Sequence, residues 1–350
     1  MKDFHAIGLM SGTSLDGLDI CYAKFQNKNG HWSFKILKAE TVAYNSDLKN
    51  QLKNSIHLSS EKLLALHSEY GFYLGDETKK FIEKNRLEHI DLIASHGHTV
   101  FHQPQNKFTL QIGDGRAIKL KTGLPVIYDF RSQDVLMGGN GAPLVPIGDE
   151  LLFSEYDACV NLGGFSNISF KKDQKRIAFD ISPLNIVLNK LAQKLGREYD
   201  ENGDVAKSGI VKKDLLEKLN SLDFYRLAAP KSLGIEWCSQ HIFTLTEVEE
   251  NTENCIATFT EHAAIQLAKV LNENGLKKVL ITGGGAYNSF FVELLKEKTG
   301  SEIIIPERQI IEFKEALIFA FMGVLRSLNE INVLSSSTGS SRDHSSGSIA

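Results

Sequence analysis

The sequence predicts an α/β protein made of two similar halves. In each half, two β-like segments flank a polar turn that contains glycine, first within residues 4–25 and again within residues 158–170. Both hairpins are followed by strand-like segments that alternate with helix-like ones, a pattern that favours duplicated α/β domains. The length of 350 residues also suits about two domains, at roughly 150 residues each.

In the first half, the strands Phe4–Met10 and Leu18–Phe25 flank the turn Ser11–Gly17. A helix is expected over residues 60–86, where Leu and Tyr side chains recur at helical spacing. Further strands are expected at Asp91–Ala94, Phe108–Ile112 and Pro125–Phe130. Residues 134–149 are rich in glycine and proline, and we place the domain junction there.

The second half repeats the alternation of strands and helices. Ser182 and Pro183 are expected to be the N-cap and first residue of a helix. Gly275 is expected to end a long helix over residues 252–274. The other expected elements are strands Ala158–Leu162, Phe165–Phe170, Arg176–Asp180 and Lys278–Thr282, and helices Tyr287–Lys298 and Glu312–Leu328.

Composition and charge exclude several classes of protein. Hydrophobic residues make up 42% and charged residues 23%, as in an ordinary globular enzyme. The net charge of −4 and the dispersed Lys and Arg residues argue against a nucleic-acid or membrane-surface partner. The four cysteines form no CxxC pair, so we expect reduced thiols in a cytoplasmic protein. No signal peptide and no apolar run of about 20 residues is visible.

The first turn has the composition of a phosphate-binding loop. Its glycines allow backbone N–H groups to approach phosphates, and its hydroxyls add donors. Asp16 and Asp19 are candidate Mg²⁺ ligands, because Mg²⁺ prefers oxygen. No Lys follows the glycines, so the loop is not a Walker A motif. The predicted cofactor-binding residues are Gly12, Thr13, Ser14, Leu15, Asp16, Gly17, Leu18 and Asp19.

Two later glycine turns follow strands. Asn161, Gly163 and Gly164 repeat the design of the first turn in the second half. The triplet Gly283–Gly285 joins a strand to a helix start, where a side chain would block a bound base. Tight turns and close packing of strand on helix would also explain these glycines. Together with the first turn, they favour an ATP site.

Three candidates could act on a second substrate. Asp180 ends a strand before a helix, a position suited to a general base, although helix capping would also explain it. Arg131 and Asp134 suit the recognition of hydroxyls or a carboxylate, or form a surface pair. The histidines at 96, 98 and 102 lack Cys or carboxylate neighbours, so a polar ligand pocket is favoured over a metal site.

These segments, in order along nearly the whole chain, resemble the anhydro-N-acetylmuramic acid kinases of the actin-like ATPase superfamily. The resemblance extends over Gly8–Asp19 and the later motifs Ser95–Thr99, Phe130–Pro143, Asn161–Ile168, Asp180–Asn185, Lys231–Trp237, Gly283–Asn288, Glu315–Gly323 and Thr338–Arg342. It implies two RNase-H-like domains with mixed five-stranded sheets, flanked by helices, and ATP in the cleft between them. The implied domains are 1–133, joined by about 312–350, and 134–311.

The resemblance also implies a reaction. 1,6-Anhydro-N-acetylmuramic acid, ATP and water give N-acetylmuramic acid 6-phosphate and ADP, a step in recycling cell-wall sugars. Asp180 would deprotonate the attacking water, and Mg²⁺ would assist phosphoryl transfer. The implied sugar-binding residues are Ser11, His98, Arg131, Asp134 and Glu315. A homodimer and an ordered C-terminal tail, residues 335–350, are also implied.

The chain departs from the family pattern at several positions, among them Ser182 and Leu233, where the family usually has Gly and Thr, and residues 343–346, which are more polar than expected. The family also usually has Gln at His98 and Asn140, Thr at Ile181 and Arg at Ile235. These departures concern the sugar rather than ATP. They keep open a kinase for a related amino or anhydro sugar. A nucleotide-dependent sensor without sugar turnover is a further alternative, because fold does not fix function.

Overall fold

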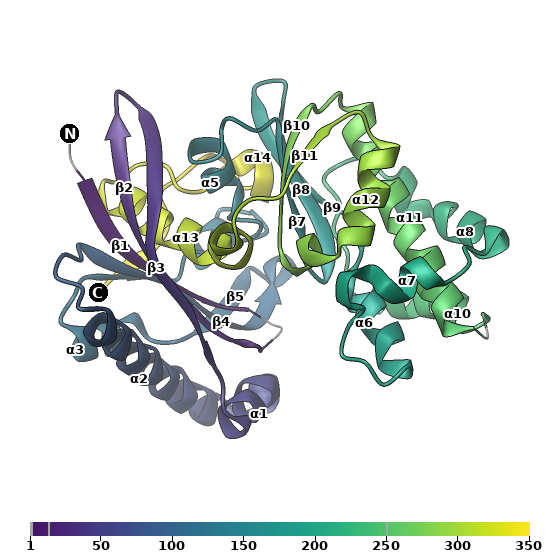
Figure 1. Cartoon of the computed structure of the whole chain (residues 1–350). Helices are drawn as coiled ribbons and strands as arrows, with labels where there is room; N and C mark the ends of the chain where they lie inside the picture. The colour runs from purple at the N-terminus through teal and green to yellow at the C-terminus, as the bar shows by residue number, and fades with distance from the viewer. Residues whose placement is uncertain (1–2, 13–14, 250) are drawn as a thin grey trace. The chain divides into compact units, whose positions relative to one another are not determined.

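The computed structural model describes residues 3–12, 15–249 and 251–350 (Figure 1). Contacts divide the chain into two units, Met1–Phe153 with Phe313–Ala350, and Ser154–Glu312. The segment 134–149, predicted as the junction, belongs to the first unit. The functional domain boundaries given above stay a prediction.

The first unit contains a mixed sheet, seven-stranded within the described residues, in the order β12-β6-β4-β1-β2-β3, with β5 paired to β4. Strands β1, β2 and β3 are antiparallel neighbours, whereas β4 and β6 run parallel to β1. The strands are β1 (Asp3–Ser11), β2 (Gly17–Lys28), β3 (His31–Ala43), β4 (Leu92–Gln103), β5 (Phe108–Ile112), β6 (Val126–Tyr128) and β12 (Ser348–Ile349).

Helices cover this sheet. An apolar core joins β1, β2 and β4 to α1 and α2 through Leu52, Leu66 and Tyr70. Helix α13 packs closely on β1, since a Cβ added at Gly8 would lie 1.8 Å from the Ala316 carbonyl oxygen. The helices are α1 (Ser46–Asn54), α2 (Ser60–Asn85), α3 (Gly115–Thr122), α4 (Ser132–Leu136), α5 (Pro146–Leu151), α13 (Arg308–Ser327) and α14 (Ser335–Thr338).

The second unit repeats the same sheet topology. Its five strands, counted within the described residues, have the order β11-β10-β7-β8-β9, which matches β6-β4-β1-β2-β3 of the first unit. Strands β7, β8 and β9 are antiparallel neighbours, and β10 and β11 continue parallel to β7. The strands are β7 (Ala158–Leu162), β8 (Phe165–Lys172), β9 (Lys175–Pro183), β10 (Lys278–Thr282) and β11 (Glu302–Ile304).

The core of the second unit forms between this sheet and its helices, above all α11 (Figure 1). Helix α11 is 22 residues long, and its buried side chains include Phe259 and Leu267. The helices are α6 (Asn185–Lys194), α7 (Asp204–Ser208), α8 (Lys213–Asn220), α9 (Ile235–Trp237), α10 (Phe243–Thr246), α11 (Thr252–Glu273) and α12 (Ser289–Lys298).

Most predicted elements are confirmed, with three differences. Helix α6 begins at Asn185 with Leu184 at its N-cap position, so Ser182 is not its N-cap and Pro183 is not its first residue. Both belong to β9, where Ser182 bonds to Ser166. The first sheet exceeds five strands because β5 and β12 add to its core pattern. Strands β3 and β11 were not predicted. The tail is ordered as predicted, and its strand β12 pairs with β6.

Candidate functional site

The turn after β1 is partly described. Thr13 and Ser14 lie outside the described residues. The Leu15 N–H donates to the Gly12 carbonyl at 3.3 Å, and Leu15 has a φ of 60°. Asp16 is exposed. Within the described residues, no group of three or more His, Cys, Asp and Glu side chains is arranged to hold a metal ion.

Asp19 and Gly17 begin β2 beside this turn. The Asp19 carboxylate accepts the Thr41 hydroxyl at 2.6 Å. A Cβ at Gly17 would lie 2.6 Å from the Val42 carbonyl oxygen, so contact with β3 already requires a glycine here. Leu18 is fully buried in the core. Of the two acidic residues, Asp16 is therefore the more accessible.

Ser11, the last residue of β1, pairs with His98 of the parallel strand β4. The Ser11 hydroxyl lies 3.2 Å from His98 Nδ1 and accepts the Tyr44 hydroxyl at 2.8 Å. Tyr44 and Tyr70 are hydrogen-bonded at 2.7 Å. Burial lowers the pKa of His98 to about 4, so the imidazole is neutral at pH 7. These buried groups form a continuous polar network beside the turn.

Arg131 follows β6 and binds His96. Its Nε–H donates to His96 Nε2 at 2.9 Å, while His96 Nδ1 lies 2.8 Å from the Gly97 carbonyl. These two bonds define one neutral tautomer, with the proton on Nδ1. Burial, and the nearby Arg131 cation, lower the pKa of His96 well below its usual value. His96 thus holds Arg131 as a neutral acceptor.

Burial also lowers the pKa of Arg131 to about 10, against the opposing field of Glu315. Arg131 therefore remains a cation at pH 7. Glu315 lies on α13, and loss of surrounding water raises the pKa of its carboxyl, whereas Arg131 and Lys314 lower it. The first unit thus brings Arg131 and Glu315 within electrostatic range of each other.

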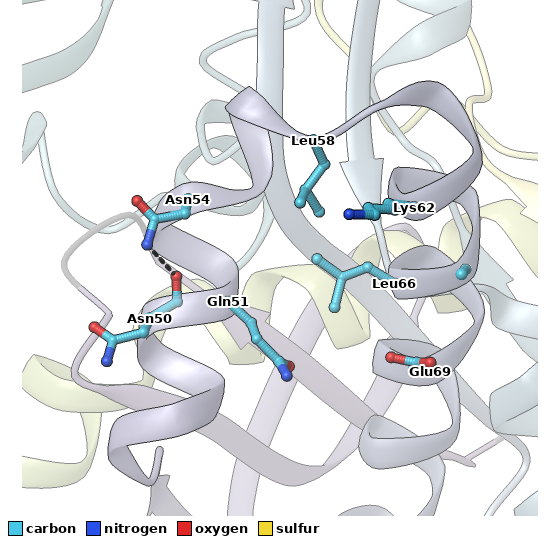
Figure 2. Close-up of a pocket in the computed structure, with 8 residues that line it drawn as sticks. Asn50, Gln51, Asn54, Leu58, Lys62, Leu66 and Glu69 are labelled. Atoms are coloured by element: carbon cyan, nitrogen blue, oxygen red, sulfur yellow. Dashed lines mark hydrogen bonds between the residues drawn. The ribbon is translucent and has the colours of Figure 1, made fainter.

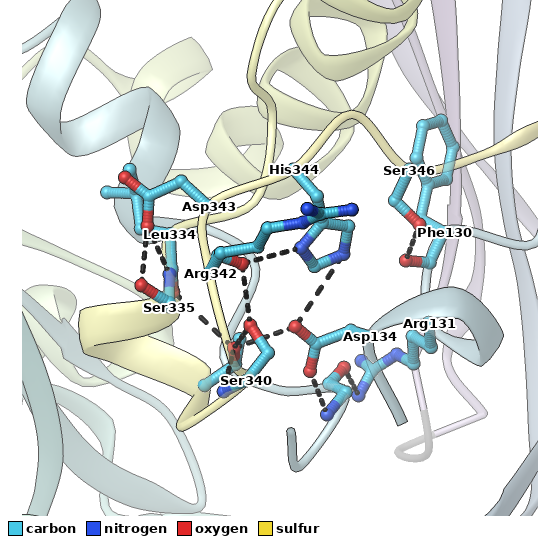
Figure 3. A network of polar contacts seen from close by, with 12 residues as sticks. Phe130, Arg131, Asp134, Leu334, Ser335, Ser340, Arg342, Asp343, His344 and Ser346 are labelled. Carbon is cyan, nitrogen blue, oxygen red and sulfur yellow. Dashed lines mark hydrogen bonds and ion pairs between the residues drawn. The ribbon is translucent and has the colours of Figure 1, made fainter. Parts of the chain in front are cut away.

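Asp134 on α4 is completely buried, and its carboxylate binds other parts of the protein (Figure 3). Oδ2 accepts the Gly141 N–H at 2.7 Å, and Oδ1 accepts the Thr338 hydroxyl at 2.8 Å. His344 Nε2 lies 3.7 Å from Oδ1. Asp134 therefore ties the C-terminal tail to the loop that follows α4. Both oxygens already have protein partners. A direct contact of Asp134 with a sugar stays a prediction.

In the second unit, the glycine turns of β7–β8 and β10 meet beside Asn161. Asn161 pairs in register with Thr282 of β10. A Cβ at Gly283 would lie 2.3 Å from Asn161 Oδ1, and one at Gly163 would lie 3.2 Å from its Nδ2. A Cβ at Gly284 would meet no protein atom within 4 Å. Packing against the protein therefore does not require a glycine at position 284, in contrast to position 283.

The turn at Gly163 and Gly164 also caps a helix. Their carbonyls accept the N–H groups of Leu184, Asn185 and Ile186, which begin α6. This explains why α6 starts without a side-chain cap. The carbonyl groups of this turn therefore have a structural role, the capping of α6.

Asp180 is half-buried near the carboxyl end of β9, opposite Asn167 of β8. Its Oδ2 accepts the Leu233 N–H at 2.8 Å, and its own N–H donates to the Lys231 carbonyl at 3.0 Å. Among the described residues, none donates a hydrogen bond to Oδ1. Burial raises the pKa of Asp180, whereas the Leu233 N–H lowers it. One carboxylate oxygen is thus fixed and the other is open.

The structure therefore assembles two sets of predicted residues, one at the carboxyl edge of each sheet. Ser11, His98 and Arg131 lie at the first edge, and Asn161 and Asp180 at the second. Sequence reasoning named His96 but not its bond to Arg131, and it missed Tyr44 and Leu233, which bind Ser11 and Asp180. Their contacts span long stretches of sequence, and no local pattern signals such partners.

The departures from the family pattern differ in their exposure: Ile181 is buried, whereas Asn140 is exposed. Ile181 is 1% exposed and belongs to the apolar core of the second unit. Asn140 uses its backbone N–H to bind the Thr338 carbonyl at 2.8 Å. Ile235 is 44% exposed at the start of α9.

A separate cavity of about 480 Å³ lies between α1 and α2 in the first unit (Figure 2). It contains none of the predicted site residues. Its lining consists of Asn50, Gln51, Asn54, Leu58, Lys62, Ala65, Leu66 and Glu69.

Two sheets of the same strand order, with glycine turns at their carboxyl edges, define an α/β protein built from two units of the same topology. A profile of the family described as Anhydro-N-acetylmuramic acid kinase matches residues 4–350. The chain therefore belongs to the anhydro-N-acetylmuramic acid kinase family. This confirms the predicted family, fold and enzyme class.

Known proteins with similar sequences carry the same description. The chain is 32% identical to "Anhydro-N-acetylmuramic acid kinase" of Francisella tularensis subsp. novicida (strain U112), over 96% of this chain and 95% of that protein. It is also 32% identical to the protein so named in Bacillus thuringiensis subsp. konkukian (strain 97-27), over 91% of each chain. Both similarities span nearly the full length of each relative.

Solved structures are more distant. One is the "Activator of the 2-Hydroxyisocaproyl-CoA Dehydratase from Clostridium difficile with bound ADPNP", at 14% identity and a TM-score of 0.45, over 93% of this chain and 97% of that chain. Among the described helices, none is long and apolar enough to cross a membrane.

Proposed function

We propose that this kinase converts 1,6-anhydro-N-acetylmuramic acid, ATP and water into N-acetylmuramic acid 6-phosphate and ADP. Full-length similarity to relatives named for this sugar supports the substrate. The main structural support for the reaction is the Asp180 carboxylate, in which one oxygen accepts a hydrogen bond and the other has no donor among the described residues. We also propose that the enzyme acts in the cytoplasm, where ATP is available, as a homodimer.

Asp180 is proposed as the general base. Its Oδ2 is fixed by the Leu233 N–H, which leaves Oδ1 to accept a proton from water. The water oxygen bonds to the anomeric carbon, and the bond between this carbon and O6 breaks. O6 then takes the γ-phosphoryl group of ATP, and ADP leaves. Burial raises the pKa of Asp180 and so makes the carboxylate a stronger base.

ATP binding is assigned to the three glycine turns. Gly284 fits this role because a Cβ there meets open space, so its backbone can approach a ligand closely. Asn161 places an amide between Gly163 and Gly283. The other proposed ATP-binding residues are Gly12, Thr13, Ser14, Leu15, Asp16, Gly17, Leu18, Asp19, Gly164 and Gly285.

Mg²⁺ would be held by Asp16, with Asp19 beside it. Two carboxylates fit this ion, which usually keeps several waters and takes its other ligands from phosphates. Asp16 is exposed, whereas Asp19 already binds Thr41. The ion would neutralise phosphate charge during transfer.

The sugar is assigned to the first unit. Arg131 is a cation oriented by His96, which suits the carboxylate of a muramic acid. Ser11, His98 and Glu315 offer hydroxyl, imidazole and carboxylate groups for sugar hydroxyls. Asp134 is proposed to act by holding the loop beside Arg131, because its oxygens bind Gly141 and Thr338.

A kinase for a related amino or anhydro sugar is the second candidate, and exposed Ile235 favours it. The test is ADP release with Mg²⁺-ATP and a panel containing 1,6-anhydro-N-acetylmuramic acid, N-acetylmuramic acid and 1,6-anhydro-N-acetylglucosamine. We expect the first sugar to give the highest kcat/KM. A preference of tenfold or more for another sugar would establish the second candidate. No turnover above the ATP-only blank would refute both.

A further inference from the structure

We propose that Lys231 is a positioning residue, whose ammonium group anchors the loop that holds Asp180 in its reactive orientation. This inference rests on the proposed role of Asp180 as general base. It concerns residues 227–234, which connect the short helix η4 (Asp223–Arg226) to α9 and form neither helix nor strand. This segment is called the clamp below.

The clamp binds Asp180 at two points. The Asp180 N–H donates to the Lys231 carbonyl at 3.0 Å, and the Leu233 N–H donates to Asp180 Oδ2 at 2.8 Å. The first bond fixes the backbone of β9 at this residue, and the second fixes the carboxylate. Both of these hydrogen bonds therefore come from an irregular segment that belongs to no helix or sheet.

Lys231 anchors the clamp through its side chain. Its Nζ donates to the Phe224 carbonyl at 3.1 Å and lies 4.5 Å from the centre of the Phe224 ring. Nζ also lies 6.0 Å from the ring of Phe179, the residue before Asp180. A cation over an aromatic face is attracted by the ring quadrupole. The ammonium thus links η4 to the strand that carries Asp180.

Helix η4 is itself fixed to the core. The Tyr225 hydroxyl bonds to Nε2 of His262 on α11 at 2.8 Å, and His262 Nδ1 lies 2.7 Å from Asn220 Oδ1. Gln266, one turn further along α11, donates to the same Asn220 oxygen at 2.8 Å. His262 is fully buried. A rigid support therefore extends from α11 through η4 to Lys231.

The groups around the clamp indicate how the pKa of Asp180 would change if the clamp were loosened. Burial and Lys269 lower the pKa of Lys231, whereas Glu273 raises it. The Leu233 N–H is the group that lowers the pKa of Asp180 against burial. If the clamp loosens, this bond weakens and the protonated form of Asp180 is favoured over a wider pH range. Less of the base is then available near neutral pH.

The test compares Lys231→Met with Lys231→Arg, which keeps the cation and a donor. Lys190→Met is the control, because Lys190 Nζ also lies over a ring of the same unit, 3.5 Å from the Phe243 centroid. We expect Lys231→Met to lower kcat about tenfold and to move the acid limb of the pH–kcat profile up by about one pH unit. Lys231→Arg should restore most of both, and Lys190→Met should change neither.

A Lys231→Met enzyme with lower kcat but an unmoved acid limb would overturn the proposal, since general destabilisation would then explain the loss. The pKa of Asp180 is also measured directly, by carboxyl ¹³C NMR titration with Asp180→Asn for assignment. A higher pKa in Lys231→Met supports the clamp, and an equal pKa refutes it. Absence of wild-type turnover on every sugar would instead refute the proposed function, and the NMR result would still decide on the clamp.

Discussion

Asp134 and Asp180 are both acidic residues predicted to act on the sugar, yet their surroundings differ. Asp134 is fully buried, and each of its oxygens binds a protein donor, the Gly141 N–H or the Thr338 hydroxyl. Asp180 is half-buried, with one oxygen bound by Leu233 and the other without a donor among the described residues. Both oxygens of the first carboxylate have a protein donor, whereas the second carboxylate keeps one oxygen free for its proposed role as a base.

With Asp180 as the proposed base, the contrast predicts that the number of unfilled acceptor positions separates a structural carboxylate from a reactive one. A buried acceptor with all of its partners present stabilises the fold, and changing it costs the partners' bonds. A fixed carboxylate with one open oxygen can accept a proton from a bound molecule. The predictions below, in order of decreasing effect, test this contrast.

Asp180→Asn should give the largest effect. The amide keeps an oxygen for the Leu233 N–H but cannot accept a proton as a base, so kcat should fall by about 10²–10⁴-fold. ATP affinity and the unfolding midpoint should stay close to wild type. ADP release, nucleotide titration and thermal unfolding measure the three quantities. Retention of the full rate would mean that Asp180 is not the base.

Asp134→Asn should show the opposite pattern, a loss of stability. Asparagine keeps one acceptor oxygen, and its amide nitrogen only donates, so either the Gly141 N–H or the Thr338 hydroxyl loses its acceptor, at a cost of about 1–3 kcal/mol. Thr338→Val should cost less, and the double variant should be less destabilised than the sum of the two. Urea unfolding measures this coupling. Additive effects would contradict the proposed tie between α4 and the tail.

The position of Asp180 could be predicted from the sequence, whereas the partners of Asp134 could not. Strand ends and glycine turns are local features, so the sequence placed Asp180, Asn161 and Gly283 near the carboxyl edge of a predicted sheet. The partners of Asp134 could not be predicted, because Thr338 lies 204 residues away along the chain. Strand β3 was missed for a related reason: it is an edge strand with mostly exposed or half-buried residues and no continuous apolar run.

The network beside the first turn should make stability depend on pH. The folded-state pKa of His98 is about 4, below its ordinary value of 6.5. Between these values the unfolded chain binds a proton that the folded protein does not. Stability is therefore present above about pH 6.5 and falls as the pH drops towards 4, by at most about 3 kcal/mol.

His98→Gln tests this dependence, since Gln can still bind Ser11 but does not titrate. The variant should lose less stability than wild type between pH 6.5 and 4, as measured by urea unfolding at a series of pH values. His262, with a pKa lowered to about 3, contributes in the same window, so the acid sensitivity should decrease rather than disappear. Equal acid sensitivity in both proteins would contradict the assignment.

The smallest effects are expected at the third glycine turn. Substitutions at its neighbouring residues Gly284 and Gly285 distinguish an effect on ATP binding from an effect on packing. Gly284→Ala meets no protein atom within 4 Å, so it should keep stability and raise the KM for ATP about tenfold. In Gly285→Ala the new methyl would lie 2.7 Å from Leu162 Cβ, so it should lower the unfolding midpoint. Steady-state kinetics and thermal unfolding of both variants decide. An unchanged KM in Gly284→Ala would remove Gly284 from the ATP site.

The most direct test of the central claim, that Asp180 activates a water that opens the anhydro ring, is isotope incorporation from H₂¹⁸O. Single-turnover reactions with 1,6-anhydro-N-acetylmuramic acid and ATP are quenched early, and N-acetylmuramic acid 6-phosphate in the same water controls for exchange. We expect one ¹⁸O at the anomeric oxygen, none in the phosphate, and no such product from Asp180→Asn. Label in inorganic phosphate without a sugar product, or an unlabelled anomeric oxygen, would contradict the account.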